Sequence, residues 1–150
     1  MSGRAVGEFL QRHEKIGLDT SVFIFQVEKN PKYIDLVNPI FRWLLGARAG
    51  GVTSTITMLE ILVQPYRVLD QDRVDQFYAL LSTYPHLEWI APTLEIADDA
   101  ARIRAQHRLS TPDAIQAATA LAGQARGFVS NDPVFKRVAG LHVLILDELT

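Results

Sequence analysis

Residues 15–30, KIGLDTSVFIFQVEKN, contain a short apolar strand that runs directly into a helix. The strand ends at Asp19, and the residues that follow place Val22, Phe23 and Val27 on one helix face. Strands that alternate with helices are typical of a parallel sheet covered on both faces. Such sheets bind ligands beyond the carboxyl ends of their strands, so Asp19 is expected at a binding edge.

The same strand-to-helix unit recurs along the chain. Apolar or β-branched segments predict further strands at residues 51–55, 87–91, 127–132 and 142–146. Breaker pairs, caps and apolar periodicity predict further helices at residues 39–49, 56–65, 70–83, 93–108, 113–125 and 133–140. Residues 1–14 are expected to form an N-terminal arm or helix. The fold predicted is a single α/β/α sandwich over residues 1–150, with a mainly parallel sheet of about five strands.

The composition limits the classes of site. The chain has 150 residues, 48% of them hydrophobic, which is enough for one compact core. It has no cysteine, which excludes disulfides, thiolate zinc sites and a cysteine nucleophile. With no apolar run near the ~18 residues of a membrane span and no signal-peptide core, we expect a cytoplasmic protein without a membrane partner. The net charge of −2 neither indicates nor excludes nucleic acid as a ligand.

Four acidic residues stand at predicted strand ends or helix starts: Asp19, Glu60, Asp113 and Asp132. Each also has an ordinary local explanation. Asp19 suits a helix N-cap, and Asp132 suits a turn before proline. Glu60 fits a capping box with Thr57, while Asp113 lies in the first turn of its helix, where negative charge is favoured. Taken singly, the four residues could be structural or functional.

Together, the four acids are expected at one edge of the sheet, because parallel strands deliver their carboxyl ends to the same side. Crowded carboxylates repel one another, and a divalent cation relieves that repulsion. All-oxygen coordination suits Mg²⁺ or Mn²⁺, which polarise phosphoryl oxygens and help to deprotonate water. The joint pattern therefore predicts metal-dependent hydrolysis of phosphodiester bonds.

Four segments, each with one of these acids, resemble the PIN-domain ribonucleases, and within them the VapC toxins of type II toxin–antitoxin modules. In chain order they are IGLDTSVFI (16–24), TSTITMLEIL (53–62), LSTPDAIQAATAL (109–121) and FVSNDPVF (128–135). The resemblance extends from about residue 16 to residue 146. It implies an endoribonuclease that uses Mg²⁺ or Mn²⁺, acts on RNA, forms a homodimer and is inhibited by a cognate antitoxin covering its active site.

The resemblance also implies separate roles for the four acids, all of which are expected to be catalytic. Asp19 and Asp113 are expected to contact the metal directly. Glu60 and Asp132 are expected to bind through water, to position the attacking water or to complete a second metal site.

Two hydroxyl residues are candidate supporting residues of the same site. Ser130 fills the hydroxyl position two residues before the last acid, where the family often has threonine. Thr20 directly follows Asp19. The chain departs from the family in having a longer N-terminal arm and a near-neutral charge.

Other functions remain open at this point. The chain could be a PIN-fold nuclease of RNA processing that has no antitoxin, or a binding module that kept the fold without catalysis. A phosphatase with an aspartyl nucleophile requires a second acid two residues after Asp19. Ser21 occupies that position, so this alternative is set aside. The pair Asp98 and Asp99 is expected to form surface ion pairs with arginines of its own helix and is left out of the site.

Overall fold

A five-stranded parallel sheet forms the centre of the protein. The computed structural model describes residues 2–46 and 48–150. The strands are β1 (Ile16–Leu18), β2 (Gly51–Ser54), β3 (Leu87–Ile90), β4 (Gly127–Ser130) and β5 (His142–Ile145). Their order is β3-β2-β1-β4-β5, and every neighbouring pair is parallel. The predicted α/β fold class is confirmed, with β1 at the middle of the sheet.

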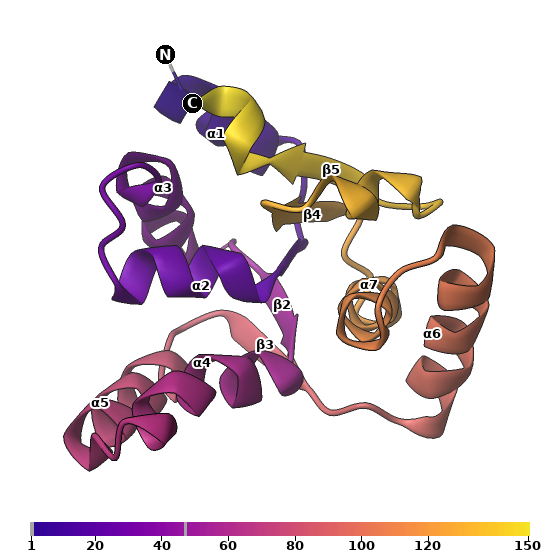
Figure 1. Cartoon of the computed structure of the whole chain (residues 1–150). Coiled ribbons are helices and arrows are strands. Elements are labelled where there is room, and N and C mark those ends of the chain that lie inside the picture. The colour runs from indigo at the N-terminus through magenta and orange to yellow at the C-terminus, as the bar shows by residue number, and fades with distance from the viewer. Residues whose placement is uncertain (1, 47) are drawn as a thin grey trace.

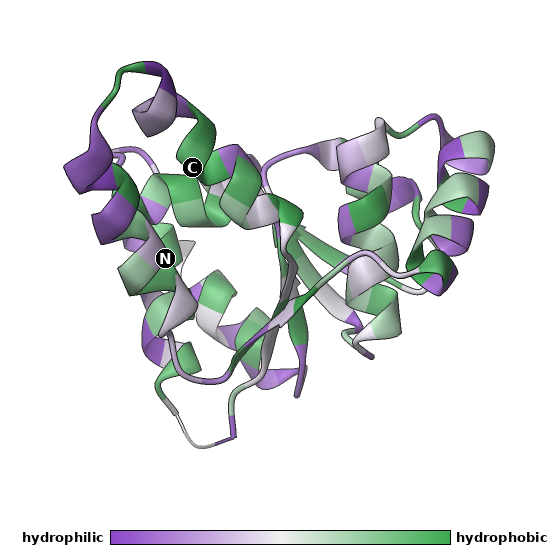
Figure 2. Ribbon diagram, turned by 90° about the horizontal axis from the view of Figure 1, so that it is seen from below, coloured by the Kyte–Doolittle hydropathy of each residue, from purple (hydrophilic) through white to green (hydrophobic). Residues whose placement is uncertain are grey.

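Helices cover both faces of the sheet, in two groups that Figure 1 and Figure 2 show on opposite sides. One group consists of α6 (Leu94–His107) and α7 (Thr111–Ala122). The other consists of α1 (Ser2–Gln11), α2 (Thr20–Val27), α3 (Ile34–Leu44), α4 (Ile56–Arg67) and α5 (Gln71–Ser82). Two 3₁₀ helices, η1 (Pro133–Arg137) and η2 (Leu146–Leu149), follow β4 and β5. None of the helices in the described part of the chain is long and apolar enough to cross a membrane.

Each face of the sheet has its own hydrophobic core. On the larger side, Val22, Phe23 and Ile40 are fully buried against β1. On the other side, alanines of α7 face Phe128 and Phe135. These short side chains allow α7 to lie close to the sheet, and β1 contributes to that close approach with Gly17, which has no side chain.

Two helices extend through prolines that were expected to bound them. The helix predicted at residues 39–49 begins earlier, at Ile34, and contains Pro39; α4 continues past Pro65 to Arg67. An internal proline costs roughly 3 kcal/mol. In α3, five apolar side chains are buried, and each contributes about 1.5–3 kcal/mol, so tertiary packing outweighs the local preference.

The carboxyl ends of β1, β2 and β4 meet at one edge of the sheet. In the register of β1 with β4, Leu18 pairs with Val129, so Asp19 and Ser130 follow at the same level. Helices α2 and α4 begin directly after β1 and β2, and η1 begins just after β4. This edge therefore combines strand ends with helix N-termini, as the sequence predicts.

Candidate active site

Asp19 is the central residue at this edge and is only 8% exposed. It is the N-cap of α2, where its Oδ1 accepts a hydrogen bond from the Thr20 backbone N–H at 2.8 Å. Its Oδ2 accepts a hydrogen bond from Ser130 Oγ at 2.7 Å. The two bonds fix both the position and the rotation of the carboxylate.

The environment of Asp19 raises its pKa from 3.8 to about 6. Burial is the largest cause, because it disfavours the charged form. The hydrogen bonds from Ser130 and Thr20 oppose that shift, while the nearby Asp113 and Glu60 carboxylates add to it. Burial thus dominates the raised pKa of Asp19, and the two hydrogen bonds offset only part of it.

Glu60 reaches the same edge from α4 and is tied to α2 rather than to its own helix. Thr20 Oγ1 donates a hydrogen bond to Glu60 Oε1 at 2.8 Å. The capping box suggested by the spacing of Thr57 and Glu60 is not formed, because the N-cap is Thr55 and it has no side-chain cap bond. The Glu60 side chain therefore turns towards Asp19's neighbour and is available to the shared edge.

A buried polar network lies beneath these two acids, and sequence reasoning missed it. Gln116 Nε2 donates to Thr57 Oγ1 at 2.7 Å and approaches Thr20 Oγ1 at 3.4 Å. Thr57 and Thr53 hydroxyls are 2.7 Å apart, and Thr53 donates to the Leu18 carbonyl at 2.9 Å. Since the Thr53 proton is used on Leu18, Thr57 donates to Thr53. The only sequence signal was that these polar residues occupy inward-facing positions.

Asp113 lies in the first turn of α7 and is half-buried. Ser110 is the N-cap of this helix, and its Oγ accepts the Asp113 backbone N–H at 3.3 Å. Burial raises the pKa of the Asp113 carboxyl, and the nearby Asp132 raises it further, while a side-chain hydrogen bond with Ser110 opposes the shift. Asp113 is thus electrostatically coupled to acids on two other elements.

Asp132 is exposed and follows β4. Its Oδ1 accepts the Val134 backbone N–H at 3.0 Å and so caps η1. Its own backbone N–H donates to Ser130 Oγ at 3.0 Å. Because Ser130 also donates to Asp19, one fully buried hydroxyl links the first and the last of the four acids.

The four acids influence one another, but they do not form a closed cage. Their electrostatic couplings run from Glu60 to Asp19, from Asp19 to Asp113, and from Asp113 to Asp132. In residues 2–46 and 48–150, no three His, Cys, Asp or Glu side chains stand close enough to enclose an ion by themselves. The oxygen donors nevertheless suit a hard cation such as Mg²⁺, which usually binds one or two protein carboxylates and keeps several waters.

Two acids outside this edge behave as surface residues. Asp98 and Asp99 on α6 form ion pairs with Arg102, as the helical spacing predicts. The carboxylates that raise the pKa of Asp19 are Asp113 and Glu60, not this pair.

Comparison with known families gave a match to the PIN domain over residues 16–141. Comparison with curated protein sequences gave no match. Among solved structures, the chain is similar to a chain of VapBC2 from Rickettsia felis bound to a promoter DNA fragment, with 17% identity and a TM-score of 0.69. The alignment covers 87% of this chain and 98% of that one.

Two further structures have the same fold. A chain of a toxin–antitoxin complex from Klebsiella pneumoniae is 19% identical, with a TM-score of 0.63, over 87% of this chain and 97% of that one. A chain of DNA-bound VapBC from Salmonella typhimurium is 22% identical, with a TM-score of 0.64, over 88% of this chain and 98% of that one. At these identities the similarity is one of fold.

Proposed function

Because this chain belongs to the PIN domain family, we propose that it is a Mg²⁺- or Mn²⁺-dependent endoribonuclease and the toxin of a type II toxin–antitoxin module. The observation that carries the proposal is the buried Asp19 carboxylate, which is held by Ser130 and repelled by Asp113 and Glu60. A cation bound there would offset both the cost of burying the charged carboxylate and its repulsion by the other two acids. A polar group kept in so unfavourable a setting is typical of functional sites.

Asp19 and Asp113 would hold the metal. Both carboxyls have raised pKa values, so each has more free energy to gain from a cation than an exposed acid does. With only two protein carboxylates in direct contact, the remaining positions of a Mg²⁺ ion would be filled by water and substrate. A metal ion held by these residues would supply polarisation of a phosphoryl oxygen and a lowered pKa for a water molecule.

Glu60 and Asp132 would orient water and hold protons at the two sides of the site. Glu60 Oε1 is occupied by the Thr20 hydroxyl, which leaves Oε2 free to accept a proton or a hydrogen bond from water. Asp132 Oδ1 is occupied by the Val134 N–H, which leaves its other oxygen free in the same way. Each acid is thus fixed through one oxygen and active through the other.

The partners proposed are RNA as substrate, a cognate antitoxin as inhibitor and a second copy of the chain. The antitoxin is supported by the fold that this chain shares with chains of three toxin–antitoxin complexes. The homodimer is supported by exposed apolar residues on α4 and α5, among them Leu59, Tyr66 and Tyr78. Light scattering at micromolar concentration should give twice the chain mass of 16.8 kDa, and a monomer mass would contradict the dimer alone.

The nuclease proposal is tested by incubating total cellular RNA with the purified protein in Mg²⁺, in Mn²⁺ and in EDTA. Asp19→Asn and Asp113→Asn keep the shape of each side chain and remove its charge, so cleavage should fall by at least 100-fold in both. Asp98→Asn makes the same change on the outer surface of α6 and should cut at the wild-type rate.

Metal-dependent fragments that both site variants fail to produce would support the nuclease and the two metal ligands. Wild-type cleavage rates in Asp19→Asn would contradict the site. Absence of cleavage by folded, antitoxin-free wild-type protein in either metal would contradict the activity itself.

A further inference from the structure

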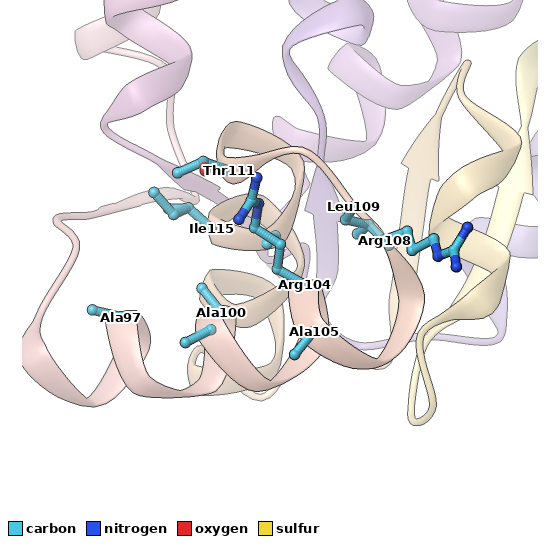
Figure 3. A pocket seen from close by; sticks show the side chains of 10 residues that line it. Ala97, Ala100, Arg104, Ala105, Arg108, Leu109, Thr111 and Ile115 are labelled. Atoms are coloured by element: carbon cyan, nitrogen blue, oxygen red, sulfur yellow. The ribbon is translucent and has the colours of Figure 1, made fainter.

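Away from the four acids, a groove of about 610 Å³ lies between α6 and α7. Alanines of α6 line much of it, and their small side chains leave the space between the two helices open. Leu109 and Ile115 complete the apolar part. Its polar part consists of Arg104, Arg108 and Thr111 (Figure 3). The groove is therefore an apolar surface with two positive charges.

The side chains of the two groove arginines make no polar interaction within the described part of the chain. Arg102, two residues before Arg104, forms ion pairs with Asp98 and Asp99. By contrast, the side chains of Arg104 and Arg108 have neither an ion pair nor a hydrogen bond with any residue in 2–46 or 48–150. In Figure 3, Arg104 extends towards Thr111 at the start of α7, while Arg108 points away from the other labelled side chains. Both guanidiniums are exposed and available to an anion.

The dipole of α6 accounts for only one of the two arginines at its C-terminal end. Arg104 lies in the last turn of α6, where a positive charge is favoured. Arg108 is the C-cap residue and adopts a left-handed conformation, with φ of 57°, which glycine or asparagine adopts at lower cost. The helix end therefore has an arginine at a position where its backbone favours a smaller residue. Neither effect accounts for the cavity that both side chains line.

The groove reaches the first turn of α7, the turn that contains the candidate metal ligand Asp113. Thr111 and Ala114 line it, and Asp113 lies between them in the first turn of α7. RNA held at Asp113 would have to bring its phosphates past four carboxylates on a chain of net charge −2. Local cations beside the acids would offset that repulsion. The planar guanidinium suits phosphate oxygens, which it binds through two parallel hydrogen bonds.

From this juxtaposition we infer that the α6–α7 groove is the subsite for the RNA backbone flanking the scissile phosphate, with Arg104 and Arg108 binding its phosphates. This inference rests on the proposed function and deepens it. The exposed alanines of α6 and the partly exposed Ile115 pack against ribose, and the groove lining provides no aromatic ring for base stacking. The subsite therefore binds the strand without reading its sequence, as phosphate contacts generally do.

The test is the binding of a fluorescently labelled single-stranded RNA in EDTA, which separates binding from cleavage, measured by anisotropy over a range of salt concentrations. The variants are Arg104→Gln and Arg108→Gly, since glycine fits the left-handed backbone and should not destabilise α6. Arg102→Gln is the control, because it removes an equal charge from the same helix outside the groove. Thermal unfolding of each variant confirms that it is folded.

Each groove variant is expected to bind RNA about tenfold more weakly, and its salt dependence should fall by about 0.7 in log–log slope for each phosphate that the variant no longer binds. Arg102→Gln should bind within twofold of wild type. In Mg²⁺, the groove variants should raise KM and leave kcat unchanged, because a flanking contact acts equally on bound substrate and transition state.

The inference is overturned if Arg104→Gln and Arg108→Gly bind RNA like wild type, if Arg102→Gln loses as much affinity as they do, or if wild type binds no RNA. A polyaspartate peptide serves as a second ligand; loss of peptide binding with unchanged RNA binding would assign the groove to an acidic protein and also overturn the inference. Cleavage by wild type with arginine-independent binding rejects only the subsite. Arginine-dependent binding by a wild type that never cuts RNA rejects only the nuclease.

Discussion

The surroundings of Asp19 oppose its ionisation, and the ionised carboxylate therefore lowers the stability of the folded protein. Its pKa is raised from 3.8 to about 6, so between these values the native state binds more protons than the unfolded state. Stability therefore falls as pH rises from about 4 to 6, and the cost at neutral pH is about 3 kcal/mol. Without metal, the carboxylate weakens the fold that positions it.

Asp19→Asn should consequently stabilise the metal-free protein at pH 7.5, by about 1–2 kcal/mol. The gain is smaller than the full cost because the amide cannot accept the Ser130 hydrogen bond on its nitrogen. Urea unfolding at pH 4 and at pH 7.5 measures the difference between variant and wild type. The difference should be larger at pH 7.5; an equal difference at both values would show that Asp19 ionises in the native state as it does in the unfolded chain.

Ser130 is expected to set the pH range of the reaction. Its hydrogen bond lowers the pKa of Asp19, so Ser130→Ala should raise that pKa by about one unit, given that a bond to a charged group is worth ~1.5–3 kcal/mol. At limiting Mg²⁺, the rising limb of the pH–rate profile should move up by a similar amount. Ser130→Thr keeps the hydroxyl and should restore the wild-type limb; an unshifted profile in Ser130→Ala would contradict the role.

The positions of residues at the sheet edge could be predicted from the sequence, but the hydrogen bonds between them could not. Asp19 and Asp132 could be placed because a strand end is visible as the last residue of an apolar run. The bond from Thr20 to Glu60 joins elements that are 40 residues apart, and nothing local indicates it. Gln116 was missed for the same reason, since its partners on α2 and α4 become neighbours only when the sheet forms.

At the scale of the elements, the position of β1 depends on close contact with α7. A Cβ atom on Gly17 would lie 2.6 Å from Phe128 Cδ1 and 2.8 Å from Ala120 Cβ. Gly17→Ala should destabilise the protein by about 1–3 kcal/mol, as overpacking does. Because Asp19 is two residues away, cleavage should fall as well.

Gly7→Ala is the matched control for this substitution. It lies in α1, and a Cβ there meets nothing within 4 Å, so the change should stabilise the helix by about 0.5–1 kcal/mol. Chemical denaturation of both variants checks the pair. Similar effects of the two substitutions would mean that α7 does not constrain β1.

Element types could be predicted more accurately than element bounds. All five strands were predicted, because each is an apolar or β-branched run between turn residues. The predicted start of α3 was wrong by five residues, since the expected start at Pro39 takes no account of the apolar side chains that α3 buries on both sides of the proline. The segment predicted as a helix at 133–140 is the shorter 3₁₀ helix η1.

At the scale of the whole molecule, the acids come from four segments that are spread from residue 19 to residue 132 and are brought to one edge by the parallel sheet. The right order of strands is therefore a condition for the site. Parallel strands with crossover helices explain how residues so distant in sequence share one electrostatic field. We propose that the four acids together form a divalent-metal site.

Mn²⁺ binding, measured by isothermal titration calorimetry at pH 7.5, tests that claim most directly, in wild type and in Asp19→Asn, Asp113→Asn, Glu60→Gln, Asp132→Asn and Asp98→Asn. Binding should be lost in Asp19→Asn and Asp113→Asn, weakened in Glu60→Gln and Asp132→Asn, and unchanged in the control Asp98→Asn. Unchanged Mn²⁺ affinity in Asp19→Asn, or an equal loss in Asp98→Asn, would contradict a metal site at this edge of the sheet.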